Sequence, residues 1–83
     1  MTLLLKAKSD TWLEIRTTSA TGPVLYSGTL VAGATKHFHA RSFWARFGAA
    51  GNVFARLEGR VIRLPSGTYS ATFDAHGFRP TGA

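Results

Sequence analysis

The chain has 83 residues and no cysteine, and its ten lysine and arginine residues outnumber its four aspartate and glutamate residues to give a net charge of +6. The length suits one domain, since typical domains run to about 100–200 residues, and the lack of cysteine excludes disulfides, cysteine-ligated metal sites and a thiol nucleophile. With 45% hydrophobic and 17% charged residues the composition is globular, and the positive charge points to an anionic partner.

Short stretches with strand-like composition, separated by glycines, run through the whole chain. Strands at such spacing are typical of a small sandwich or barrel, and no segment sustains the period of an amphipathic helix. We therefore predict an all-β domain over residues 1–76, a small antiparallel β-sandwich of about seven or eight short strands, followed by a flexible tail over residues 77–83. The expected strands are Leu3–Lys8, Thr11–Thr17, Val24–Leu30, Thr35–Ala40, Ser42–Phe47, Val53–Leu57, Arg60–Leu64 and Tyr69–Asp74.

Two hairpins are expected in the second half of the chain. The first would join Ser42–Phe47 to Val53–Leu57, so that the facing ends of the two strands pair. The second would join Val53–Leu57 to Arg60–Leu64 through a two-residue turn at Glu58 and Gly59, where glycine tolerates positive φ. Successive residues of a strand point to opposite sides of a sheet, and both registers keep the apolar side chains on one side. Together the hairpins predict a three-stranded unit with one apolar face and one mixed face.

The mixed, outer face of this unit would alternate aromatic rings with guanidinium groups. Such a surface can stack sugars or bases while arginine side chains hold anions. It can equally be an internal cation–π ladder, in which cross-strand pairs contribute about 0.2–1 kcal/mol each. The candidate partner-binding residues are Trp44, Arg46, Phe54, Arg56 and Arg63, and a second candidate surface consists of Trp12, Glu14 and Arg16. The alternative for Trp12 is an edge ring packed beneath the loop of residues 18–23.

Catalysis and metal binding have little support in the residues present. His37 and His39 lie two apart, a spacing that suits metal ligation if His76 or a carboxylate supplies a third ligand. Exposed histidines of a polar strand are the more ordinary interpretation. The sequence has no G-x-S-x-G, P-loop or H-E-x-x-H motif. We therefore predict no catalytic residue, no metal site and no cofactor.

Three blocks of the chain follow the order and spacing of a known family. The first is the aromatic strand Asp10–Arg16, and the second is Val24–Gly28 followed by a glycine turn at Gly33. The third combines Phe47–Val53 with Leu57–Arg60 and the Leu64-Pro65 pair. Together these blocks resemble the extracytoplasmic C-terminal domain of the RodZ family of bacterial cell-shape proteins over nearly the whole chain.

Two positions depart from the family pattern. Ala49 and Glu58 stand where the family usually has asparagine. Asparagine tolerates the left-handed conformation better than glutamate, so the turn type at Glu58 is left open.

The resemblance implies a β-sandwich held outside the cytoplasmic membrane, in the periplasm or on the outer face, by a spanning helix that is not in this chain. The domain would be a non-enzymatic interaction domain that links shape control to wall synthesis. Its expected partners are wall-synthesis proteins of the divisome or elongasome, or anionic wall polymer, with membrane contact only through the upstream helix. The alternative is a small basic β-domain that binds single-stranded nucleic acid by tracking phosphates and stacking bases.

Overall fold

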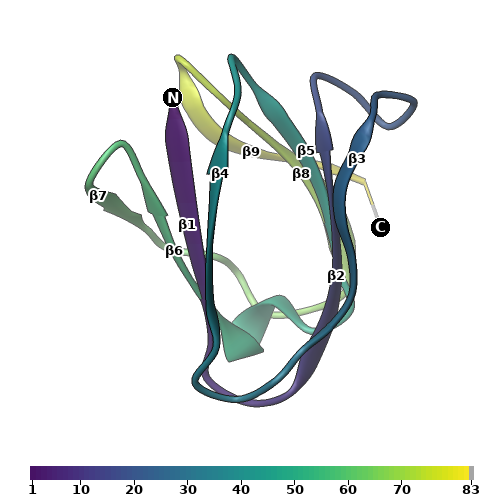
Figure 1. Cartoon of the computed structure of the whole chain (residues 1–83), viewed down its shortest axis with the longest axis vertical. Coiled ribbons are helices and arrows are strands. Elements are labelled where there is room, and N and C mark those ends of the chain that lie inside the picture. The colour runs from purple at the N-terminus through teal and green to yellow at the C-terminus, as the bar shows by residue number, and fades with distance from the viewer. Residues whose placement is uncertain (83) are drawn as a thin grey trace.

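Two antiparallel sheets packed face to face make up the computed structural model, which describes residues 1–82 (Figure 1). The predicted all-β sandwich is confirmed, with nine strands among these described residues in place of seven or eight. None of the described residues belongs to a helix long and apolar enough to cross a membrane. The strands are β1 (Thr2–Ala7), β2 (Thr11–Thr17), β3 (Val24–Leu30), β4 (Thr35–His39), β5 (Phe43–Phe47), β6 (Val53–Leu57), β7 (Arg60–Ile62), β8 (Tyr69–Asp74) and β9 (Gly77–Gly82).

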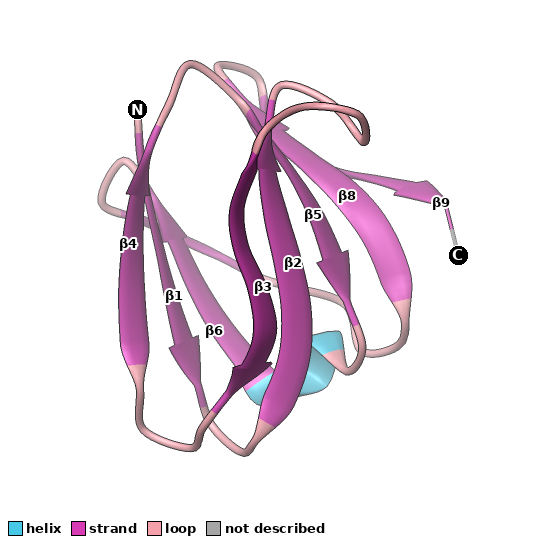
Figure 2. Cartoon of the chain, turned by 45° about the vertical axis from the view of Figure 1, so that its right-hand side comes forward, coloured by secondary structure: helices cyan, strands magenta, loops and turns pink. Residues whose placement is uncertain are grey.

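Each sheet takes strands from both halves of the chain. The four-stranded sheet has the order β4-β1-β6-β7, and the five-stranded sheet has the order β3-β2-β5-β8-β9. Figure 2 shows β4, β1 and β6 side by side in one layer and β3, β2, β5 and β8 in the other. Because β1 and β2 enter different sheets, the chain crosses between the layers at its first turn.

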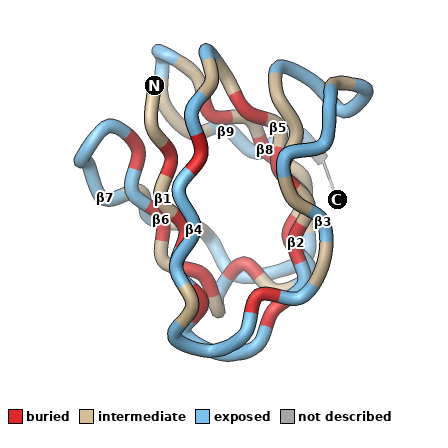
Figure 3. Tube along the Cα trace, viewed as in Figure 1, coloured by how far each residue is buried: buried red, intermediate tan, exposed pale blue. Residues whose placement is uncertain are grey.

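The core lies between the two sheets and consists mainly of alternate residues of β1, β2, β5, β6 and β8, which are coloured as buried in Figure 3. In β5, for example, Phe43, Ala45 and Phe47 are fully buried, whereas Trp44 and Arg46 are only partly buried. This period of two is what a strand with one face on a core requires. The other fully buried side chains are Leu3, Leu5, Ala7, Leu13, Ile15, Ala50, Ala55, Ala71 and Phe73.

The expected hairpin between β5 and β6 does not form. Strand β5 pairs with β2 and β8, and β6 pairs with β1 and β7. The segment between them contains a 3-10 turn at Ala50–Asn52, and Ala50 is fully buried. The turn carries the chain from one sheet to the other, so the predicted three-stranded unit is wrong.

The second expected hairpin is present. Arg56 lies opposite Val61, as predicted, and the two turn residues Glu58 and Gly59 have φ values of 51° and 79°. Positive φ at both central residues defines a type I′ turn, whose twist matches that of the flanking strands. The glutamate therefore occupies a left-handed conformation that side chains other than asparagine and glycine seldom adopt.

Residues 77–82 do not form the flexible tail that we expected. Gly77–Gly82 is strand β9, which pairs with β8 so that Phe78 lies opposite Phe73. The Phe78 ring lies 5.3 Å from the Phe73 ring and 6.3 Å from the Tyr69 ring, centroid to centroid. These ring contacts hold β9 against β8. The segment contains mostly glycine and polar residues, so its sequence did not predict a strand. Ala83 lies outside the described residues.

Candidate interaction surfaces

Both tryptophans lie on the outer face of the five-stranded sheet. Trp12, Glu14 and Arg16 alternate with buried residues of β2, and Trp44 and Arg46 do the same on the neighbouring β5. The register sets Arg16 opposite Trp44 and Glu14 opposite Arg46. The second predicted surface and two of the five residues of the first therefore form a single surface. We call Trp12, Glu14, Arg16, Trp44 and Arg46 the tryptophan face.

Hydrogen bonds hold the arginine side chains of the tryptophan face in place. Arg16 donates through Nε to the Glu14 carboxylate and through Nη1 to the Gly22 carbonyl oxygen, at 3.0 Å in the second case. Arg46 donates through Nη1 to the Ser70 hydroxyl at 3.1 Å. The carboxylate of Glu14 offsets part of the positive charge, so this surface is aromatic and ordered rather than strongly basic.

Trp12 does not pack beneath the loop of residues 18–23. It lies near the start of β2, whereas that loop follows the other end of the strand. Its carbonyl accepts a hydrogen bond from the Gly48 amide at 2.9 Å, and the residue is 40% exposed. Val24 and Leu25 of the adjacent edge strand β3 are exposed to a similar degree. Val24 lies opposite Arg16, whereas Trp12 lies opposite Thr29, so these exposed apolar residues are at the other end of the strand pair from Trp12.

Phe54 and Arg56 lie on the outer face of the other sheet, on the opposite side of the sandwich from Trp44 and Arg46. Lys6 of β1 is the partner of Phe54, and the Arg56 guanidinium lies 5.7 Å from the centroid of the Phe54 ring. On β4, the exposed histidines flank the buried Phe38 and point outward as well. We call Lys6, His37, His39, Phe54 and Arg56 the basic face.

Arg63 belongs to neither surface by register. It follows the last residue of β7, Ile62, and is exposed. The structure therefore divides the five residues of the first predicted surface among two opposite faces and a loop. Their role in binding stays a prediction.

None of the four aspartate and glutamate carboxylates in residues 1–82 pairs with a cation of the basic face, although Glu58 follows Arg56 by two residues. Glu14 belongs to the tryptophan face, and Asp74 lies on β8, where one oxygen is 3.8 Å from the Arg79 guanidinium. Asp10 accepts a hydrogen bond from the Ala32 amide at 2.7 Å, and Glu58, in the β6–β7 turn, lies 3.7 Å from the N-terminal ammonium of Met1. The excess positive charge is therefore concentrated on the four-stranded sheet.

The two histidines of β4 lack a third ligand for a metal ion. His37 and His39 share one face of the strand, as the sequence predicts, and His39 Nδ1 lies 3.0 Å from the Thr2 hydroxyl. His76 belongs to the β8–β9 turn of the other sheet. Residues 1–82 contain no group of three histidine, aspartate or glutamate side chains that could hold a metal ion.

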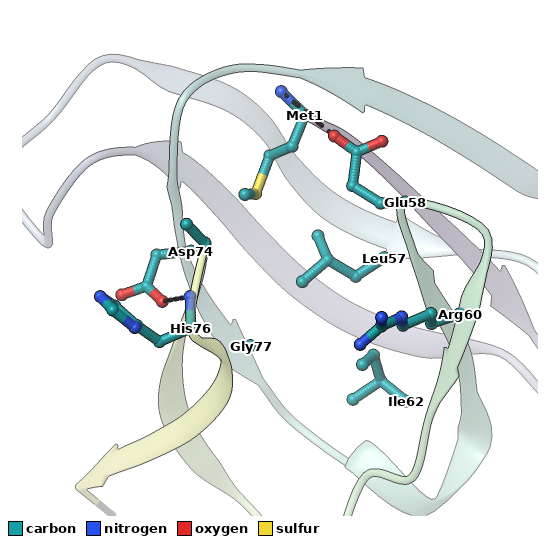
Figure 4. Close-up of a pocket in the computed structure, with 9 residues that line it drawn as sticks. Met1, Leu57, Glu58, Arg60, Ile62, Asp74, His76 and Gly77 are labelled. Atoms are coloured by element: carbon teal, nitrogen blue, oxygen red, sulfur yellow. Dashed lines mark hydrogen bonds and ion pairs between the residues drawn. The ribbon is translucent and has the colours of Figure 1, made fainter.

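An open pocket of about 550 Å³ lies between the β6–β7 and β8–β9 turns (Figure 4). Figure 4 shows Leu57 and Ile62 between the rim residues Glu58 and Arg60 on one side and His76 on the other. The residues come from separate segments, so sequence spacing gives no signal for this pocket. It holds no arrangement of nucleophile and base that would support catalysis among the residues described.

Residues 5–73 match the family described as the RodZ C-terminal domain. The chain belongs to the RodZ C-terminal domain family. The matched region runs from within β1 to within β8 and contains the tryptophan face and all of β2 to β7. RodZ is a family of cell-shape proteins, and its C-terminal domain is a structural and interaction domain rather than a catalytic one. No curated protein and no solved structure matches the chain.

Proposed function

We propose that this chain is the extracytoplasmic interaction domain of a RodZ-like morphogenesis protein, which links shape control to wall synthesis and has no catalytic step of its own. Membership of the RodZ C-terminal domain family supports the cell-shape role. A spanning helix upstream in the full protein would hold the domain in the periplasm or on the outer face of the cytoplasmic membrane. The partner would be a protein of the wall-synthesis machinery, in the elongasome or the divisome.

The tryptophan face carries this proposal. Tryptophan and arginine are the residues most enriched among those that dominate binding energy at protein interfaces. Trp12 and Trp44 supply two such rings on neighbouring strands, and Arg16 and Arg46 lie beside them. A partner would meet guanidinium groups that are already ordered by Glu14 and Ser70, which lowers the entropy cost of binding.

The function is tested by replacing both tryptophans in the full-length protein. We expect Trp12→Ala with Trp44→Ala to abolish normal cell width while the protein remains at its normal level and location. Val31→Ala is the matched control, because Val31 is 58% exposed in the β3–β4 loop, away from both faces. Trp44 is partly buried, so thermal unfolding of the isolated variant must show that it is folded. Normal shape in cells with a folded double variant would contradict the proposal.

The location is tested separately. Alkaline phosphatase, which is active only outside the cytoplasm, is fused to the C-terminal end of the full protein. Activity of the fusion supports an extracytoplasmic domain, and an inactive but abundant fusion overturns that placement. The inactive result would favour the nucleic-acid-binding alternative. That alternative requires the domain to bind oligonucleotides tightly and with a strong dependence on salt.

A further inference from the structure

We infer that the basic face is a second binding surface and that its ligand is an anionic polysaccharide. The inference does not depend on the tryptophan face or on its protein partner. It rests on the position of two cations at the centre of an exposed sheet, on the absence of an ion pair at either cation among the described residues, and on the kind of groups that lie beside them.

Lys6 and Arg56 occupy the two central strands of the four-stranded sheet. Lys6 lies opposite Phe54, and Arg56 lies two residues further along β6, so the two cations are diagonal neighbours. Diagonal neighbours on adjacent strands are about 7–8 Å apart, close enough for one ligand segment to contact both. Both residues are exposed.

Neither Lys6 nor Arg56 forms an ion pair with another described residue. On the tryptophan face Arg16 already binds Glu14, but on the basic face the outward strand partners of β1 are His39, His37, Thr35, Arg56 and Phe54, none of which is acidic. Glu58, at the end of this row, lies 3.7 Å from the N-terminal ammonium of Met1. A ligand that brings carboxylates to this sheet therefore displaces no internal ion pair. Hydrogen bonds between a ligand carboxylate and Lys6 or Arg56 would be charge-assisted, and such bonds are stronger than hydrogen bonds between neutral groups.

Neutral hydrogen-bonding groups lie along one flank of the cations. Thr35, opposite Lys6, and His37, two residues further along β4, present a hydroxyl and ring nitrogens to solvent. His39 follows on the same face, where its Nδ1 lies 3.0 Å from the Thr2 hydroxyl. A polysaccharide offers hydroxyls to these groups as well as acids to the cations. The side chains present thus match both kinds of group on a uronate-bearing glycan.

Other anionic partners fit the basic face less well. A protein interface would place Lys6 at its centre, where lysine is depleted because it must be desolvated. Single-stranded nucleic acid gains most from aromatic rings on which bases stack, and the ring of Phe54 is already covered by Arg56. A bilayer would require apolar side chains that insert, whereas Leu4 and Phe54 are half-buried in the sheet.

The test is a titration of the 83-residue chain with oligogalacturonate at low salt, followed by nuclear magnetic resonance. We expect the largest shift changes at Lys6, His37 and Arg56, and no change with neutral dextran. Lys6→Gln with Arg56→Gln should raise the Kd about tenfold or more, since the variant loses both charge-assisted contacts to the ligand carboxylates. Arg41→Gln with Arg79→Gln removes the same charge from a loop and from the other sheet, and should change affinity less than about threefold.

Several outcomes would overturn the inference. These are no binding of oligogalacturonate, shift changes confined to other surfaces, or equal weakening by the two double variants. The face would be assigned to another ligand if that ligand bound more tightly than oligogalacturonate. The ligands to compare are oligothymidylate, an oligoglutamate peptide, and vesicles of phosphatidylglycerol and phosphatidylcholine. Because Trp12→Ala lies on the other sheet, it should leave oligogalacturonate binding intact, which separates a failure here from a failure of the proposed function.

Discussion

Glu14 lies directly opposite Arg46 on the paired strands β2 and β5, and its carboxylate also accepts a hydrogen bond from Arg16 two residues along its own strand. The carboxylate therefore pairs with Arg16 and is the cross-strand neighbour of Arg46. This relationship explains how an exposed sheet of a strongly basic chain can carry two arginines without unfavourable repulsion.

Replacing Glu14 with Gln should lower the free energy of unfolding by about 1 kcal/mol, because it removes the ion pair and leaves Arg16 and Arg46 close together. Urea unfolding at low and high salt measures the effect, which should shrink as salt screens the two arginines. Glu58→Gln is the matched control, since it removes the same charge from a side chain that is 57% exposed and whose one ion pair, with the Met1 ammonium, is long at 3.7 Å. An equal loss in both variants would show that Glu14 has no special role.

The turn at Glu58 gives a second prediction. Its φ of 51° is left-handed, so Glu58→Asn should raise the free energy of unfolding by about 0.5–1 kcal/mol, because asparagine tolerates this conformation. Glu58→Ala removes the same charge without that tolerance and should not stabilise the chain. Urea unfolding of the three proteins decides the matter, and an asparagine variant no more stable than the alanine variant would contradict the turn assignment.

The location of the strands could be predicted because it depends on a local pattern. In β5 the alternation of Phe43, Ala45 and Phe47 with Trp44 and Arg46 shows which side chains face a core, whatever that core contains. Each expected range accordingly overlaps a strand of the structure. Trp44 and Arg46 could thus be placed on an outer face from sequence alone.

The pairing of the strands could not be predicted from the same pattern. A hairpin between β5 and β6 and a crossing between two sheets both turn Trp44 and Phe54 away from the core. The two rings share a surface only in the hairpin, and the structure has the crossing. The buried Ala50 marks the difference, because a residue in a hairpin loop would be exposed, but alanine itself gives no signal of burial.

Alkaline pH should destabilise the chain through Tyr69. Burial raises the pKa of Tyr69 above its ordinary value of 10.0, and its hydroxyl donates to the Pro65 carbonyl oxygen at 2.7 Å. The folded state therefore holds the proton more tightly than the unfolded state. The contribution of this group is fully present below about pH 10 and is lost as the pH rises through the folded-state pKa.

Thermal unfolding as a function of pH tests this effect. Tyr69→Phe should have a lower dependence of stability on pH above about pH 10 than the unmodified chain. Tyr26→Phe is the matched control, because the Tyr26 hydroxyl also donates to a backbone carbonyl, that of Thr29 at 3.0 Å. The idea fails if the two variants have the same alkaline slope.

The last prediction concerns β9, which the sequence led us to expect as a flexible tail. Phe78 packs against the rings of Phe73 and Tyr69, so Phe78→Ala should lower the free energy of unfolding by about 2 kcal/mol, less than the cost for a fully buried phenylalanine. Arg79→Ala, whose side chain is 70% exposed on the same strand, should cost less than about 0.5 kcal/mol. Urea unfolding distinguishes the two variants. If residues 77–82 were a loose tail, neither substitution would change the midpoint, and amide hydrogens of β9 would exchange as fast as those of an unfolded peptide.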